Sequence, residues 1–164
     1  MKRILLAGAA LMAAAFVTPA LADSVNGAST NGTAAVTIFT PITVTQSQGL
    51  NFGTITSGAA GTVQIDAASS SRKVNGGVGA VAQDPGQAGA FVVTGQTNAA
   101  INVVVGGSID GFASGITGKT QVGTLPTALV GTSASFPVGG ILNIPSNTPA
   151  GQYKGTYTVA VNYP

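Results

Sequence analysis

Apolar and polar residues alternate along much of this chain, most clearly near its C-terminus. Between Gly151 and Tyr163 most residues of one parity are aromatic or β-branched, while the other parity is small, polar or charged. A two-residue period with this composition is typical of a half-buried β-strand. We therefore predict a strand over residues 151–163. Its inward face would line a core or a groove and consists of Tyr153, Tyr157, Val159, Val161 and Tyr163.

A second alternating segment lies nearer the N-terminus. Five apolar residues share one parity, which only Thr40 interrupts, and Thr37, Thr43 and Thr45 lie on the other; the apolar set is Ala34, Val36, Ile38, Ile42 and Val44. The pattern predicts an extended segment. Pro41 should bend it, because proline cannot donate to a β-ladder.

Short apolar or alternating runs, separated by Gly, Pro and Asn, fill the rest of the chain. They predict strands over residues 61–66, 89–94, 100–105 and 136–144, with at least one more strand and an irregular loop between 112 and 135. Many short strands punctuated by turn residues are the signature of a β-sandwich. The predicted fold class is all-β, an immunoglobulin-like β-sandwich that could lack one strand supplied by a partner.

The glycine-rich stretch 75–79 interrupts the alternation, and we predict a loop or bulge there. Residues 77–82 match a dinucleotide-binding fingerprint, but a turn signal follows where that fingerprint needs a helix. No cofactor is predicted. Asp84 and Asp110 stand in turn dipeptides, where their carboxylates should accept hydrogen bonds from the local backbone.

The first 22 residues have the pattern of a secretory signal peptide. A positive start at Lys2 and Arg3 precedes an apolar run, and an A-x-A cleavage site ends at Ala22. The apolar run is shorter than the ~18 residues that a membrane span needs. We expect residues 23–32 to be a flexible leader and residues 33–164 to form one domain, exported across the inner membrane with no span in the mature chain.

Charge and chemistry narrow the function classes. Once the signal peptide is removed, four basic residues balance four aspartates, so the mature chain would carry no basic surface for nucleic acid. A net charge near zero favours association. The chain has no Cys, His or Glu, which are the residues that catalysis and metal binding usually recruit. We therefore predict no disulfide, no catalytic residue and no metal site, and a protein that is not an enzyme.

Several short motifs resemble known exported proteins. Residues 139–144, 149–153 and 157–163 resemble the ending of chaperone–usher pilin subunits, particularly the archaic, spore-coat-U-like group. Residues 50–55, the Gly76–Gly77 pair and residues 89–95 look closer to a related family of small proteobacterial exported β-domains. Many pilins carry a disulfide in the first part of the domain, and this chain has none.

The resemblance implies a sandwich whose missing strand leaves a groove beside the last strand. In such pilins a periplasmic chaperone fills the groove first, and the N-terminal extension of the next subunit, delivered at an outer-membrane usher, then replaces it. Residues 33–40, with Ala34, Val36 and Ile38 on one face, are the candidate donor strand; the alternative is that residues 33–45 form the domain's own first strand. The implied function is a structural subunit of a surface pilus or fibre serving adhesion or biofilm formation. The alternative function is a monomeric carbohydrate- or surface-binding β-sandwich.

Overall fold

The structure is a computed structural model that describes residues 27, 28 and 30–164. The chain divides into two units, residues 1–36 and 37–164, and each is described by itself. Described residues of the first unit have no regular secondary structure, and their side chains are exposed. The predicted signal peptide and much of the predicted leader lie outside the described residues.

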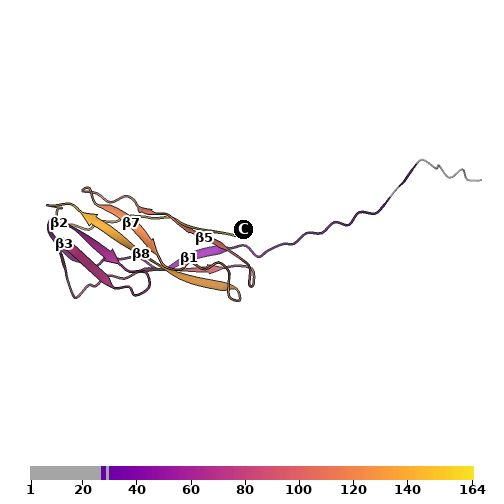
Figure 1. Cartoon of the computed structure of the whole chain (residues 1–164), viewed down its shortest axis with the longest axis horizontal. Coiled ribbons are helices and arrows are strands. Elements are labelled where there is room, and N and C mark those ends of the chain that lie inside the picture. The colour runs from indigo at the N-terminus through magenta and orange to yellow at the C-terminus, as the bar shows by residue number, and fades with distance from the viewer. Residues whose placement is uncertain (1–26, 29) are drawn as a thin grey trace, which may run out of the picture. The chain divides into compact units, whose positions relative to one another are not determined.

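The second unit is an all-β sandwich, which confirms the predicted fold class (Figure 1). Its alternating and apolar runs form antiparallel strands because their inward residues can share one core. The strands in chain order are β1 (Thr43–Gln48), β2 (Ile55–Ile65), β3 (Arg72–Ala80), β4 (Gly89–Thr94), β5 (Asn102–Val105), β6 (Ser108–Ile109), β7 (Thr117–Val122), β8 (Ser133–Ile144) and β9 (Val159–Asn162).

Strand β8 is the centre of the larger sheet. Its first half pairs with β4 and its second half pairs with β2 on one edge and β7 on the other. The sheet runs β1-β4-β8-β2-β3, and β6 pairs with β7. Strands β5 and β9 form a separate two-stranded sheet. This arrangement leaves β1 and β9 each with one partner strand.

The core consists of two hydrophobic clusters. The first is built around the stacked rings of Phe91 and Phe136, whose centroids are 5.6 Å apart, and also contains Val93, Ile101, Val103, Leu129 and Val138. The second cluster contains Val63, Val78, Ile116, Leu142 and Ile144. Strand β8 supplies residues to both clusters, so it joins the two halves of the domain.

The glycine-rich stretch 75–79 is part of strand β3, so of the two predicted alternatives, a loop or a bulge, the structure has the bulge and not the loop. A Cβ on Gly77 would lie 2.9 Å from the Cα of Ala59, and one on Gly76 would lie 2.6 Å from the carbonyl oxygen of Ala60. The pairing with β2 is irregular at this point. Glycine is therefore used here because two strands approach closely at a bulge, and not to provide mobility.

The two turn aspartates also differ from their predicted role. Asp84 accepts a hydrogen bond from the hydroxyl of Thr54 at 2.7 Å, and Asp110 accepts one from the hydroxyl of Ser108 at 2.8 Å. Both partners are side chains. The Val81 amide donates to the carbonyl oxygen of Thr54 at 3.1 Å, which holds Thr54 near Asp84, and Ser108 lies two residues before Asp110. Asp66 instead caps its turn by accepting from backbone amides, and hydrogen bonds from Ser69 lower the pKa of its carboxyl.

Regular pairing is shorter than predicted at both ends of the domain. Strand β1 begins at Thr43, after Pro41, and residues 30–42 have no regular secondary structure. In the terminal segment only β9 pairs continuously, and Thr156 makes an isolated bridge to Asp110. The partner strand β5 has four residues, so it cannot pair with the whole of residues 151–163.

Candidate functional site

Strands β1 and β9 provide the two walls of the candidate site. Each pairs along only one of its edges, β1 with β4 and β9 with β5. All six residues of β1 are exposed. An edge strand presents unpaired backbone N–H and C=O groups, which can pair with another strand. The two unpaired edges belong to different sheets and border the same hollow.

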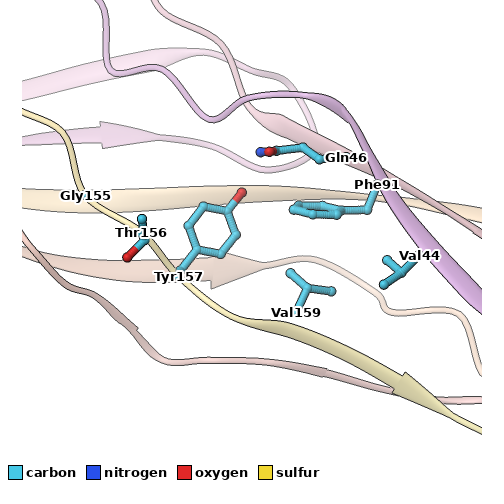
Figure 2. A pocket seen from close by; sticks show the side chains of 7 residues that line it. All are labelled: Val44, Gln46, Phe91, Gly155, Thr156, Tyr157 and Val159. Carbon is cyan, nitrogen blue, oxygen red and sulfur yellow. The ribbon is translucent and has the colours of Figure 1, made fainter.

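A groove follows the terminal segment and has a narrow part, which lies between these walls, and a wide part beyond it; the two parts share Gly155 and Tyr157. The narrow part is a cavity of about 250 Å³ between Val44 and Gln46 of β1 and residues 155–159, with Phe91 at its floor (Figure 2). The wide part is about 1040 Å³ and lies between residues 50–56 and 148–155. Its apolar lining includes Leu50, Phe52, Ile109, Phe112, Ile116, Leu142, Ile144 and Tyr153. We call the whole hollow the terminal groove.

Four of the five residues predicted for the inward face pack on the first core cluster. Tyr157, Val159, Val161 and Tyr163 are half-buried there, while Tyr153 packs on the second cluster. The intervening Lys154, Thr156, Thr158, Ala160 and Asn162 are exposed. The terminal segment therefore runs along both clusters and forms the wall of both parts of the groove.

Two tyrosines of this segment reach across the sandwich to glycines at the ends of β4. A Cβ on Gly89 would lie 2.7 Å from the Tyr157 hydroxyl, and one on Gly95 would collide with the Tyr163 hydroxyl. Any other residue at either position would push its tyrosine outward. These contacts help to hold the terminal segment, because it lacks a second neighbouring strand.

The Tyr157 hydroxyl is the one polar group of the groove floor that is buried without a hydrogen-bond partner in the described part of the chain. The Tyr157 ring packs edge-on against Phe91, with centroids 6.0 Å apart. Burial raises the pKa of the phenol above its ordinary value, and the nearby Gln46 opposes the shift without reaching hydrogen-bond geometry (Figure 2). The groove thus contains an unused hydrogen-bonding group.

Removing this hydroxyl should stabilise the isolated domain. An unsatisfied buried polar group costs about 1–3 kcal/mol, so Tyr157→Phe should raise the free energy of unfolding by roughly 1 kcal/mol. Urea denaturation monitored by circular dichroism would measure the change. The control is Tyr153→Phe, which deletes a hydroxyl that donates to the carbonyl oxygen of Pro149 at 2.7 Å and should lower stability.

Tyr157→Phe should also differ from the parent protein at high pH. Because the raised pKa of Tyr157 favours the neutral phenol in the folded state, its contribution to stability is complete below about pH 10 and is lost as the pH rises through the folded pKa. Tyr157→Phe should lose less stability than the parent as the pH rises above about 10. An identical alkaline loss in both proteins would contradict this assignment.

The candidate donor residues lie at the N-terminal side of β1. Ala34 and Val36 belong to the first unit, and Ile38 belongs to the second. None is in a strand, and the side chains of Val36 and Ile38 are 82% and 84% exposed. Large apolar side chains this exposed, on one parity of an extended segment, are suited to binding another surface.

The sequence did not predict that β1 would form a wall of the groove, nor that Arg72 would fix the loop beside it. The alternation through Val44 indicated a strand, but nothing local showed that its edge would face the terminal segment. Arg72 donates from Nη1 to the carbonyl oxygens of Phe52, Thr54 and Asp84, and from Nη2 to that of Val81, at 2.7–3.2 Å. It thereby fixes the loop that lines the wide part of the groove.

Within residues 27, 28 and 30–164, no helix has the length and hydrophobicity to cross a membrane. In the same described ranges, no three side chains of the usual metal-binding types come together.

Comparison with known protein families finds one family whose model matches this chain. A family model described as a domain of unknown function (DUF4402) matches residues 42–163, which include every strand and the whole terminal groove. No curated protein and no solved structure matches the chain.

Proposed function

The chain belongs to the DUF4402 family, and we propose that it is a structural subunit of a surface pilus or fibre that assembles by donor-strand exchange. The observation that carries the proposal is the narrow part of the terminal groove, which lies between β1 and the terminal segment, two elements that each leave a strand edge without a neighbour. A strand inserted there would pair with backbone groups on both walls. It would also cover Tyr157 and Val159.

The N-terminal segment of a second copy has the composition that such a groove needs. Ala34, Val36 and Ile38 present three apolar side chains on one parity, and the intervening Ala35 and Thr37 would face solvent. Strand addition of this kind draws affinity from main-chain hydrogen bonds and specificity from pockets that receive alternate side chains. Export by the signal peptide, help from a periplasmic chaperone and an outer-membrane usher, and a role in adhesion or biofilm formation belong to the same proposal.

Polymer formation should depend on the parity of the N-terminal segment. Val36→Asp would bring a charge into the apolar groove of another copy, so it should abolish polymers. Thr37→Asp is the matched control on the opposite parity and should leave them intact. Full-length protein, exported by an expressing bacterium, would be analysed by size-exclusion chromatography with light scattering and by electrophoresis without heating.

A second arm tests the groove directly. A variant lacking residues 23–37 retains Phe39 and Thr40 and should fold as a monomer. A synthetic peptide of residues 27–38 should bind it saturably and raise its Tm, because a ligand that binds only the folded state stabilises that state. Two results together would contradict the proposal. The full-length protein would stay monomeric at high concentration, and the truncated domain would not bind the peptide. Saturable glycan binding by that monomer would favour the carbohydrate-binding alternative.

A further inference from the structure

The residues that precede β1 are tied to the far end of the terminal segment. The Tyr163 hydroxyl donates to the carbonyl oxygen of Thr40 at 2.7 Å, and the Phe39 ring packs edge-on against the Tyr163 ring with centroids 5.1 Å apart. Figure 1 marks the C-terminus close to the chain that leads into β1. Two segments from opposite ends of the domain therefore meet at Tyr163.

Gln96 completes this contact from a third direction. Its backbone N–H donates to the Tyr163 hydroxyl at 2.7 Å, and its side-chain Oε1 accepts from both the amide and the hydroxyl of Thr40 at 3.2 Å. The preceding Gly95 leaves the space that the tyrosine ring fills. We call Phe39, Thr40, Gln96 and Tyr163 the Tyr163 latch.

The latch stands immediately beside the candidate donor residues. Phe39, in the latch, is 47% exposed, whereas the preceding Ile38 is 84% exposed. The boundary between the anchored residues and the exposed donor residues therefore lies between Ile38 and Phe39. On the other side of the latch Ile42 packs on the first core cluster. Without the latch, residues 37–42 would be a flexible linker. A fully flexible linker of this length has a root-mean-square end-to-end distance of roughly 13 Å.

We infer that Tyr163 is a positioning residue that fixes the root of the N-terminal segment at one end of the terminal groove. This inference rests on the proposed function for its consequence, because a fixed root gives the joint between successive copies a set geometry. The donor segment of each copy then begins at a fixed position on its own domain. The fibre should therefore bend less at each joint than a fibre whose donor segments are attached through a flexible linker. Tyr163 acts through Phe39 and Thr40 and does not itself enter the partner's groove.

The absence of cysteine allows a direct test on the unassembled protein. Spin labels at Ile38→Cys and Lys119→Cys would report the distance between the root and an exposed position on β7. The parent pair should give a narrow distance distribution in pulsed electron paramagnetic resonance. Adding Tyr163→Phe removes both hydrogen bonds of the hydroxyl and should widen the distribution about twofold. Gln96→Ala, which keeps the tyrosine, should widen it in the same direction.

Tyr153→Phe is the matched control, because it deletes a tyrosine hydroxyl at the other end of the groove and should leave the distribution narrow. A parent distribution as broad as that of Tyr163→Phe would overturn the inference, as would equal broadening by Tyr153→Phe. This readout needs no polymer, so it separates the latch from donor-strand exchange. If the parent forms fibres, electron microscopy should show a shorter persistence length for Tyr163→Phe. Unchanged stiffness in that variant would refute the role in the joint.

Discussion

Val159→Asp should prevent the domain from accumulating as a folded protein. Val159 is half-buried against the first core cluster, and it lines the narrow part of the groove opposite Val44. No cationic residue lines this cavity, and the polar side chains that line it, those of Gln46, Thr156 and Tyr157, are uncharged and could not neutralise a carboxylate at this position. The expected cost is several kcal/mol, which is a large part of a typical total stability of ~5–15 kcal/mol.

Thr158→Asp is the control for this experiment. Thr158 is the adjacent residue and its side chain is exposed, while its backbone carbonyl accepts from Gly106 at 2.8 Å whatever the side chain is. Surface substitutions usually change stability by less than about 0.5 kcal/mol. The periplasmic amount of each variant and its urea midpoint would measure the difference. Equal tolerance of both variants would show that the terminal segment is neither core nor groove wall.

Arg72→Met should be the second strongly destabilising substitution. The guanidinium is part-buried and bonds four backbone carbonyls from two loops, which no other side chain can replace. A methionine fills similar space but leaves the carbonyl oxygens of Phe52 and Asp84 without a donor, while those of Thr54 and Val81 keep one backbone N–H each. The combined cost should be about 2–4 kcal/mol. With a urea m-value of about 1–3 kcal/mol/M, the midpoint should fall by roughly 1 M or more.

Lys73→Met controls for the loss of a positive charge on the same strand, because Lys73 is exposed and should change the midpoint little. Arg72→Lys should recover only part of the loss, since one ammonium cannot reach all four carbonyls. Weaker binding of the residue 27–38 peptide should accompany Arg72→Met, because Phe52 and Thr54 line the wide part of the groove. A midpoint shift no larger than that of Lys73→Met would refute the bracing role.

The N-terminal residues show how the two proposals can be separated. Val36 and Ile38 would act in a neighbouring copy, whereas Phe39 and Thr40 contact their own domain through Tyr163. A substitution at residue 36 should therefore change assembly without changing the root distance. A substitution at Tyr163 should change the root distance in the unassembled protein.

Local pattern was sufficient for the fold class and for many element positions. The predicted strand over residues 89–94 coincides with β4, and the predicted strand over 136–144 lies within β8. In the terminal segment the alternation of half-buried and exposed residues follows the predicted parity. Parity can be read from sequence because successive side chains of any extended chain point to opposite faces, whichever strand lies beside it.

Partner choice was decided only by the tertiary structure. No feature within residues 43–48 shows that β1 would pair with β4 and leave its other edge beside the terminal segment. The segment that approaches the glycines of β3, the carbonyl oxygens that accept from Arg72, and the hydrogen bond between Tyr163 and Thr40 could not be predicted either, since each depends on residues distant in the chain. Alternation determines which face of a strand is buried, but edges and close approaches depend on how all the strands share one core.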